Sequence, residues 1–129
     1  MAAASPPLAL ASRFIETTSV PWIENGPGHK SKVIYYDPVT DMLTFVSKLD
    51  PGARIPPHTH EDLEQTYVLE GSLLDDEGEC TAGNFVIRAE GSRHSPTAPK
   101  GCTMIVFFLK PTAVLKKALA MHTQAPALA

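Results

Sequence analysis

Apolar and polar positions along this 129-residue chain form short runs rich in β-branched and aromatic residues, and turn-forming residues separate the runs. The turn sequences include Asp37-Pro38, Asp50-Pro51-Gly52 and Asp76-Glu77-Gly78. Short strands at such regular intervals are typical of an antiparallel sandwich or barrel, so the pattern indicates an all-β fold. The predicted strands cover residues 13–20, 31–36, 42–49, 64–70, 85–89 and 102–110, with shorter ones at 72–74 and 94–98.

The two ends of the chain differ from this pattern. We expect residues 1–12 to be a disordered lead-in rather than a targeting segment, because they lack basic residues and Pro6-Pro7 interrupts the apolar stretch. Residues 13–111 are the predicted barrel. In residues 112–129, the apolar residues Val114, Leu115, Ala118 and Met121 have helical spacing, which predicts a short C-terminal helix followed by a tail.

Composition narrows the function classes. A hydrophobic fraction of 43% and a charged fraction of 19% are ordinary for a globular domain. Lys116-Lys117 is the only basic doublet, so we expect no nucleic-acid partner, and no apolar run approaches the ~20 residues of a membrane span. Cys80 and Cys102 favour two reduced thiols in a cytoplasmic protein, although a single bridge between them stays open.

Three of the five histidines lie around one acidic stretch and one turn. His58 and His60 are two residues apart, so in an extended strand both imidazoles point to the same face. Glu64 follows four residues later, and His94 follows the turn Glu90-Gly91-Ser92. Imidazole and carboxylate donors suit Fe(II), Mn(II), Ni(II), Cu(II) or Zn(II), and four such ligands leave two octahedral positions open for substrate or dioxygen.

These residues also carry a family resemblance. The spacing Gly52-x5-His58-x-His60-x3-Glu64-x6-Gly71 resembles the first cupin motif, and Gly83-x7-Gly91-x2-His94 resembles the second. The resemblance implies a cupin double-stranded β-helix, a jelly-roll barrel, that binds one divalent metal ion through His58, His60, Glu64 and His94. Ala89 and Ala98 depart from the second motif, which usually has proline and often asparagine there.

A narrower resemblance is to the ChrR-type cupins. It rests on Trp22, Asp75-Asp76-Glu77-Gly78, Ala82-Gly83, Gly91-Ser92, His94-Ser95-Pro96 and Gly101-Cys102-Thr103. This group includes an anti-sigma factor domain, and it is similar to single-domain dioxygenases that cleave diketones and hydroxylated acetophenones. The anti-sigma proteins carry a separate zinc domain with His and Cys ligands. Because this chain has only His29 before His58 and no cysteine before Cys80, we expect the anti-sigma role not to transfer.

The resemblance implies a non-haem Fe(II) dioxygenase that cleaves a carbon–carbon bond in a small diketone or hydroxyketone. Fe(II) is favoured, and Zn(II), Mn(II) and Ni(II) also fit the ligands. No catalytic residue beyond the ligands, and no organic cofactor, can be singled out. A non-catalytic Zn(II)-binding sensor, and a metal-dependent isomerase or lyase, remain alternatives.

Other residues support weaker expectations. Arg88 and Arg93 could bind a substrate carboxylate, but we expect solvated charges at the barrel rim, and His29 should lie on the surface. The strand at 102–110 is apolar on both faces, so we expect both to be buried. We also expect a homodimer, in which residues 13–20 pair with the sheet edge of a neighbouring subunit.

Overall fold

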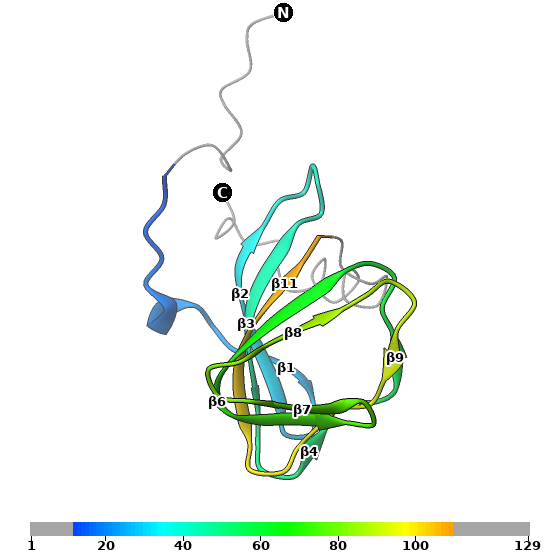
Figure 1. Cartoon of the computed structure of the whole chain (residues 1–129). Coiled ribbons are helices and arrows are strands. Elements are labelled where there is room, and N and C mark those ends of the chain that lie inside the picture. The colour runs from blue at the N-terminus through cyan, green and yellow to red at the C-terminus, as the bar shows by residue number, and fades with distance from the viewer. Residues whose placement is uncertain (1–11, 110–129) are drawn as a thin grey trace, which may run out of the picture.

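The structure is a computed structural model that describes residues 12–109. Its strands form one curled sheet and a separate pair (Figure 1). They are β1 (Ile23–Gly26), β2 (His29–Tyr36), β3 (Leu43–Leu49), β4 (Ala53–Arg54), β5 (His58–Thr59), β6 (Glu64–Asp75), β7 (Gly78–Thr81), β8 (Phe85–Arg88), β9 (Arg93–His94), β10 (Thr97–Ala98) and β11 (Cys102–Phe108). This confirms the predicted all-β fold, and the curled sheet is that of a cupin barrel.

The large sheet has the order β1-β2-β3-β11-β6-β10-β4, with β7 and β8 also paired to β6, and β5 pairs with β9. Non-consecutive neighbours such as β3, β11 and β6 show that the chain crosses over between strands, as in a jelly roll. In the register of these strands, Phe108 of β11 stands opposite Leu43 of β3 and Glu64 of β6. Figure 1 shows β9, the partner of β5, closing one end of the barrel.

The core follows from the alternation of side chains along the central strands. In β11, Cys102, Met104, Val106 and Phe108 are buried. Phe107 lies on the other face and is 36% exposed, so the prediction that both faces of this strand are buried is wrong. The buried face of β11 packs with residues of β3 and β6, including Leu43, Leu49 and Val68.

Gly71 joins the predicted strands 64–70 and 72–74 into the single strand β6. Its φ is +72°, and a Cβ at this position would lie 1.9 Å from the carbonyl oxygen of Gly101. No side chain fits there, because such a distance is far inside van der Waals contact. Glycine therefore lets the long strand bend against the turn that precedes β11.

Residues 13–20 are not a strand, contrary to the prediction. They form an irregular segment that ends in the 3-10 helix η2 (Thr17–Ser19). The N–H groups of Ser19 and Val20 donate to the carbonyls of Glu16 and Thr17, which takes the backbone out of an extended conformation. The expectations for residues 1–11 and for the C-terminal helix after residue 109 lie outside the described residues.

Two predictions about the chain as a whole can be compared with the described residues. Between residues 12 and 109 there is no helix with the length and apolar character needed to cross a membrane. Cys80 and Cys102 are both buried and free, in agreement with the expectation of reduced thiols.

Candidate metal centre

The β5–β9 pair places three histidines on one face. His58 of β5 stands directly opposite His94 of β9. The N–H of His60 donates to the carbonyl of Ser92 at 2.8 Å, and the N–H of Gly91 donates to the carbonyl of His60 at 2.7 Å, which extends the pairing past β5. Side chains two residues apart share a face, and directly opposed antiparallel residues share it too, so all three imidazoles converge.

The three imidazoles meet through their Nε2 atoms. His94 Nε2 lies 2.8 Å from His60 Nε2 and 3.0 Å from His58 Nε2. Two ligand atoms bound at ~2.1 Å to one ion stand ~3.0 Å apart at a right angle and ~3.4 Å apart at a tetrahedral angle. The observed spacing therefore fits neighbouring positions of an octahedral site.

The opposite ring nitrogens show which tautomer the residues favour. His58 Nδ1 lies 2.8 Å from the carbonyl oxygen of Pro56, and His94 Nδ1 lies 2.9 Å from Oδ2 of Asp75. Both partners only accept hydrogen bonds, so the proton of each ring is placed on Nδ1 and the lone pair on Nε2. Lone pairs that face one another at this distance repel unless a cation lies among them, and a divalent ion fits that requirement.

Burial keeps His60 and His94 neutral. It lowers the pKa of His60 from 6.5 to about 4, with further contributions from His94, His58 and Arg88. Burial also lowers the pKa of His94, and the hydrogen bond to Asp75 opposes this change. Neutral imidazole is the form that binds metal ions, so these rings are ready to bind below neutral pH.

Glu64 lies next to this cluster, and the three histidines form a group without it. Its Oε2 atom is 3.7 Å from Nδ1 of His60, on the side of the ring away from the other histidines' Nε2 atoms. Burial raises the pKa of Glu64 to about 7, although Arg88 and a hydrogen bond from Thr66 lower it. Nδ1 of His60 is buried and has no hydrogen-bond partner among the described residues.

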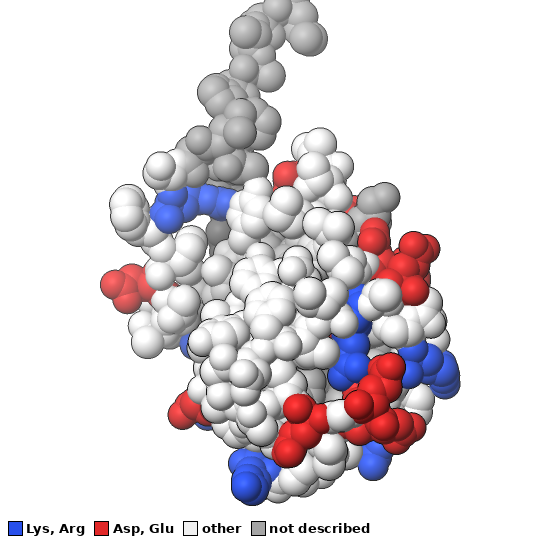
Figure 2. Space-filling model, in the orientation of Figure 1, with Lys and Arg blue, Asp and Glu red and all other residues white. Residues whose placement is uncertain are grey.

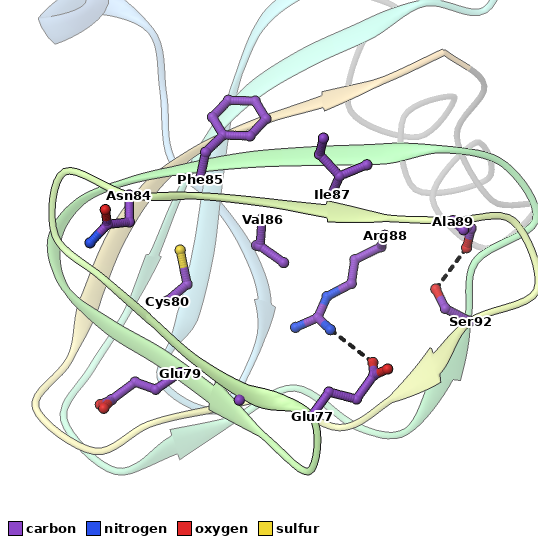
Figure 3. Close-up of a pocket in the computed structure, with 11 residues that line it drawn as sticks. Glu77, Glu79, Cys80, Asn84, Phe85, Val86, Ile87, Arg88, Ala89 and Ser92 are labelled. Atoms are coloured by element: carbon purple, nitrogen blue, oxygen red, sulfur yellow. Dashed lines mark hydrogen bonds and ion pairs between the residues drawn. The ribbon is translucent and has the colours of Figure 1, made fainter.

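Asp75 connects His94 to a buried arginine that lines a second cavity. Arg88 is only 8% exposed, and its guanidinium donates to Oδ2 of Asp75 and, at 3.0 Å, to Oε1 of Glu77. Figure 3 shows the Arg88 side chain extending from β8 toward Glu77. The expectation of a solvated charge at the rim is therefore wrong for Arg88, because its guanidinium is needed to pair with a carboxylate inside the barrel.

The carboxylate of Asp75 is surrounded by donors. Burial raises its pKa, but hydrogen bonds from His94 and from the backbone N–H of Glu77, together with the charge of Arg88, outweigh burial and leave the pKa lowered. Asp75 was not among the predicted site residues. Its acidic turn Asp75-Asp76-Glu77-Gly78 gave a resemblance to the ChrR-type cupins, but nothing in the spacing linked it to His94.

Two of the three histidines border a cavity of about 600 Å³ inside the barrel. Its walls are mainly apolar and include Val33, Phe45, Met104, Val106 and Phe108. His58, His94 and Glu64 line it, and so does His29, which is partly buried rather than on the surface as expected. An apolar cavity of this size with a few convergent polar groups is typical of a small-molecule site.

Fold and site together define a cupin with a candidate three-histidine metal centre. The profile of the ChrR cupin-like domain family matches residues 11–113, so the chain belongs to this family. No curated protein matches the chain significantly.

Solved structures show the same fold. A chain of the complex between SigE and the anti-sigma ChrR from Rhodobacter sphaeroides has a TM-score of 0.63 and 24% identity, over 70% of this chain and 49% of that chain. This protein thus spans about half the length of that chain. Acetylacetone dioxygenase from Acinetobacter johnsonii has a TM-score of 0.69 and 14% identity, over 76% and 74% of the two chains. KdgF from a Halomonas species has a TM-score of 0.65 and 24% identity, over 81% and 98%.

Proposed function

We propose that this protein is a mononuclear non-haem Fe(II) dioxygenase that cleaves a carbon–carbon bond in a small diketone or hydroxyketone. The observation that carries the proposal is the convergence of three imidazole Nε2 atoms beside an apolar cavity that His58 and His94 line. Two of the pairs lie 2.8 and 3.0 Å apart, a spacing that suits an octahedral centre with free positions. The acetylacetone dioxygenase among the structures with the same fold supports the same class of reaction.

The chain's own residues would hold and shield the reacting groups. His58, His60 and His94 would bind the ion, while Pro56 and Asp75 keep the protons of two rings on Nδ1. When bound, Fe(II) would supply the Lewis acidity that favours the enolate of the substrate and the redox chemistry with dioxygen. The apolar walls would exclude bulk water and orient the carbon skeleton.

We propose Glu64 as the fourth ligand. Its carboxyl group is buried beside His60, and Arg88, the cation whose charge acts on it, forms its ion pairs with Asp75 and Glu77 instead. A buried carboxylate is costly without a counter-charge, and a divalent ion next to His60 would supply one. Glu64→Gln should then weaken metal binding, whereas a carboxylate that only orients His60 could be replaced by the amide oxygen with little loss.

A second candidate function is a Zn(II)-binding regulatory cupin. It is favoured by membership of the ChrR cupin-like domain family, and the anti-sigma ChrR complex is among the structures with the same fold. Zinc has no redox chemistry, so the two functions differ in a property that can be measured directly.

The test combines metal analysis with oxygen uptake. Protein purified from cells grown without added metal is analysed for metal content, and iron-loaded protein is assayed with a panel of diketones and hydroxyketones. Iron at one ion per chain with substrate-dependent oxygen uptake is the expected result. Stoichiometric zinc with no uptake would overturn the dioxygenase and favour the regulator. His60→Ala and His94→Ala should lose the ion, and Thr59→Ala, an exposed neighbour on β5, should retain it.

We further propose that the protein is a homodimer, formed through the outer face of β6 and β8. Within residues 12–109, β8 pairs only with β6, so its other edge is open to a second strand. The face over these strands is largely uncharged (Figure 2), and Tyr67, Phe85 and Ile87 are 38%, 48% and 62% exposed there. Light scattering should give a dimer mass that Ile87→Asp converts to a monomer mass, and a monomeric parent protein would contradict the proposal.

A further inference from the structure

The cavity that holds the histidine cluster contains a second polar group. Along the inward faces of β2 and β3, the residues that line the cavity are apolar at Val33, Leu43 and Phe45. At the other end of the same two faces, the lining residues are His29, Ser31 and Ser47. A polar side chain inside a small barrel lowers stability unless it forms hydrogen bonds, because an apolar residue would fill the same position without a desolvation penalty.

These polar residues are held in a connected network. Asn25 donates from its amide nitrogen to the hydroxyl of Ser31 at 2.6 Å, and Ser31 lies opposite Ser47 in the β2–β3 register. The hydroxyl of Ser47, which is fully buried, lies 2.8 Å from Nε2 of His29. The network therefore fixes the His29 ring at the wall of the cavity.

The surroundings also indicate which ring nitrogen of His29 is free. Burial, and second the nearby His58, lower the pKa of His29, so the ring is neutral. The amide nitrogen of Asn25 lies 3.5 Å from Nε2, and the hydroxyl of Ser47 lies 2.8 Å from the same nitrogen. The contacts of the ring therefore use Nε2. Among the described residues none forms a hydrogen bond with Nδ1, so this nitrogen is left for a polar group of a molecule in the cavity.

The two polar groups lie at different levels of the barrel. Phe108, which packs 6.2 Å from the ring of His60, stands opposite Leu43 in β3, whereas Ser47 stands opposite Met104. These levels are four residues apart along β3 and β11, and His58 still lies close enough to His29 to lower its pKa. Phe45 and Val106 face the cavity between the two levels. A molecule that bridges the two groups therefore has polar atoms at both and an apolar part against Phe45 and Val106.

We infer that His29, supported by Ser47, forms a substrate subsite that binds a hydroxyl or carbonyl group at the end of the molecule away from the metal centre. The ligand class is an elongated ketone with chelating oxygens at one end, an apolar or aromatic body and a second hydrogen-bonding group at the other end. This inference rests on the proposed function, because chelation at the histidine cluster defines the first end. His29 then determines specificity without touching the chelated oxygens.

The test uses two probes that share a chelating diketone and differ by one hydroxyl group, benzoylacetone and its para-hydroxyphenyl analogue. Binding to Zn(II)-loaded protein is measured by calorimetry, so that no turnover interferes with the affinity. The wild type should bind the hydroxylated probe about tenfold more tightly, the magnitude of one hydrogen bond in a buried site. His29→Phe keeps the ring volume and should remove this preference, while the affinity for benzoylacetone stays within a factor of two or so.

Ser47→Ala is the second variant, and it should reduce the preference because the His29 ring loses its support. Lys48→Ala is the matched control, since Lys48 is exposed on the opposite face of the same strand. Equal affinity of the wild type for both probes would overturn the subsite and leave the metal centre standing. The subsite is also overturned if His29→Phe keeps the tenfold preference. Binding of neither probe would overturn the proposed function itself.

Discussion

Replacing Asp75 with asparagine tests whether the carboxylate behind His94 prepares the metal centre. Each oxygen of Asp75 accepts from two donors. Oδ2 accepts from His94 Nδ1 at 2.9 Å and from the guanidinium of Arg88, and Oδ1 accepts from the N–H groups of Glu77 and Gly78 at 2.9 and 3.3 Å. An asparagine has one oxygen and one NH2 group, so one pair of donors must face another donor.

Both orientations of the new amide have a cost. If the NH2 group faces His94, the ring must carry its proton on Nε2, where the metal ion would bind. If it faces Glu77 and Gly78, the turn between β6 and β7 loses its acceptor. Loss of such a partner behind a ligating histidine typically weakens metal binding 10–100-fold, or roughly 1.4–2.7 kcal/mol. We also expect the free energy of unfolding to fall by about 1–3 kcal/mol, because Arg88 keeps only the exposed Glu77 as an ion-pair partner.

The assay is competition for Zn(II) between the protein and a chelator of known affinity, with urea unfolding of the metal-free protein measured in parallel. Asp76→Asn is the matched control, because Asp76 is exposed in the same turn. The control should behave as the wild type in both measurements. If Asp75→Asn is folded and binds Zn(II) as tightly as the wild type, Asp75 does not position His94 and the reasoning is refuted.

Three further results are expected. Gly71→Ala should destabilise the protein by more than ~3 kcal/mol in urea unfolding, because the new Cβ would lie 1.9 Å from the carbonyl oxygen of Gly101. Gly52→Ala is the control, because Gly52 also has a positive φ, +82°, but lies in open space, and it should cost only ~1–2 kcal/mol. Equal losses of stability in the two variants would contradict this account. In the metal-free protein, the pKa of His60 is about 4 when folded and 6.5 when unfolded, so His60 makes the free energy of unfolding rise with pH between those values, whereas Glu64, with a pKa of about 7 when folded and 4.5 when unfolded, makes it fall. Glu64→Gln removes the opposing effect, so urea unfolding should show a rise of up to about 3 kcal/mol between pH 4 and 6.5. A pH profile that Glu64→Gln leaves unchanged would argue against the buried carboxyl. Cys80 and Cys102 should react with a thiol reagent at pH 8 only after unfolding, because both are buried and burial raises the pKa of Cys102 to about 11. Rapid labelling of the native protein would count against this prediction.

Local sequence patterns were enough to predict most strands. Alternation and β-branched residues located β2, β3, β8 and β11, whereas the short strands β1, β4, β5 and β7 were not predicted. These patterns failed at residues 13–20, where the composition resembles a strand but none of the strands between residues 12 and 109 pairs with the segment. A strand is stable only when it is paired, and pairing is not a property of the segment itself.

The sequence by itself determined that His58 and His60 share a face, because two residues are one full period of a strand. The spacing of glycines and histidines also predicted the cupin family, which the family match confirms. These inferences succeed because each depends on residues that are close in the chain or on a motif of set spacing.

Only the tertiary structure decided which other residues reach the site. Asp75 meets His94 across 19 residues of chain, and Ser47 meets His29 across 18, through the curl of the sheet and the register of its strands. The same packing selected Met104, Val106 and Phe108 as the inward face of β11, although both faces are apolar in sequence. A side chain's partners depend on how the sheet closes, and closure is set by the sum of many weak contacts rather than by any one segment.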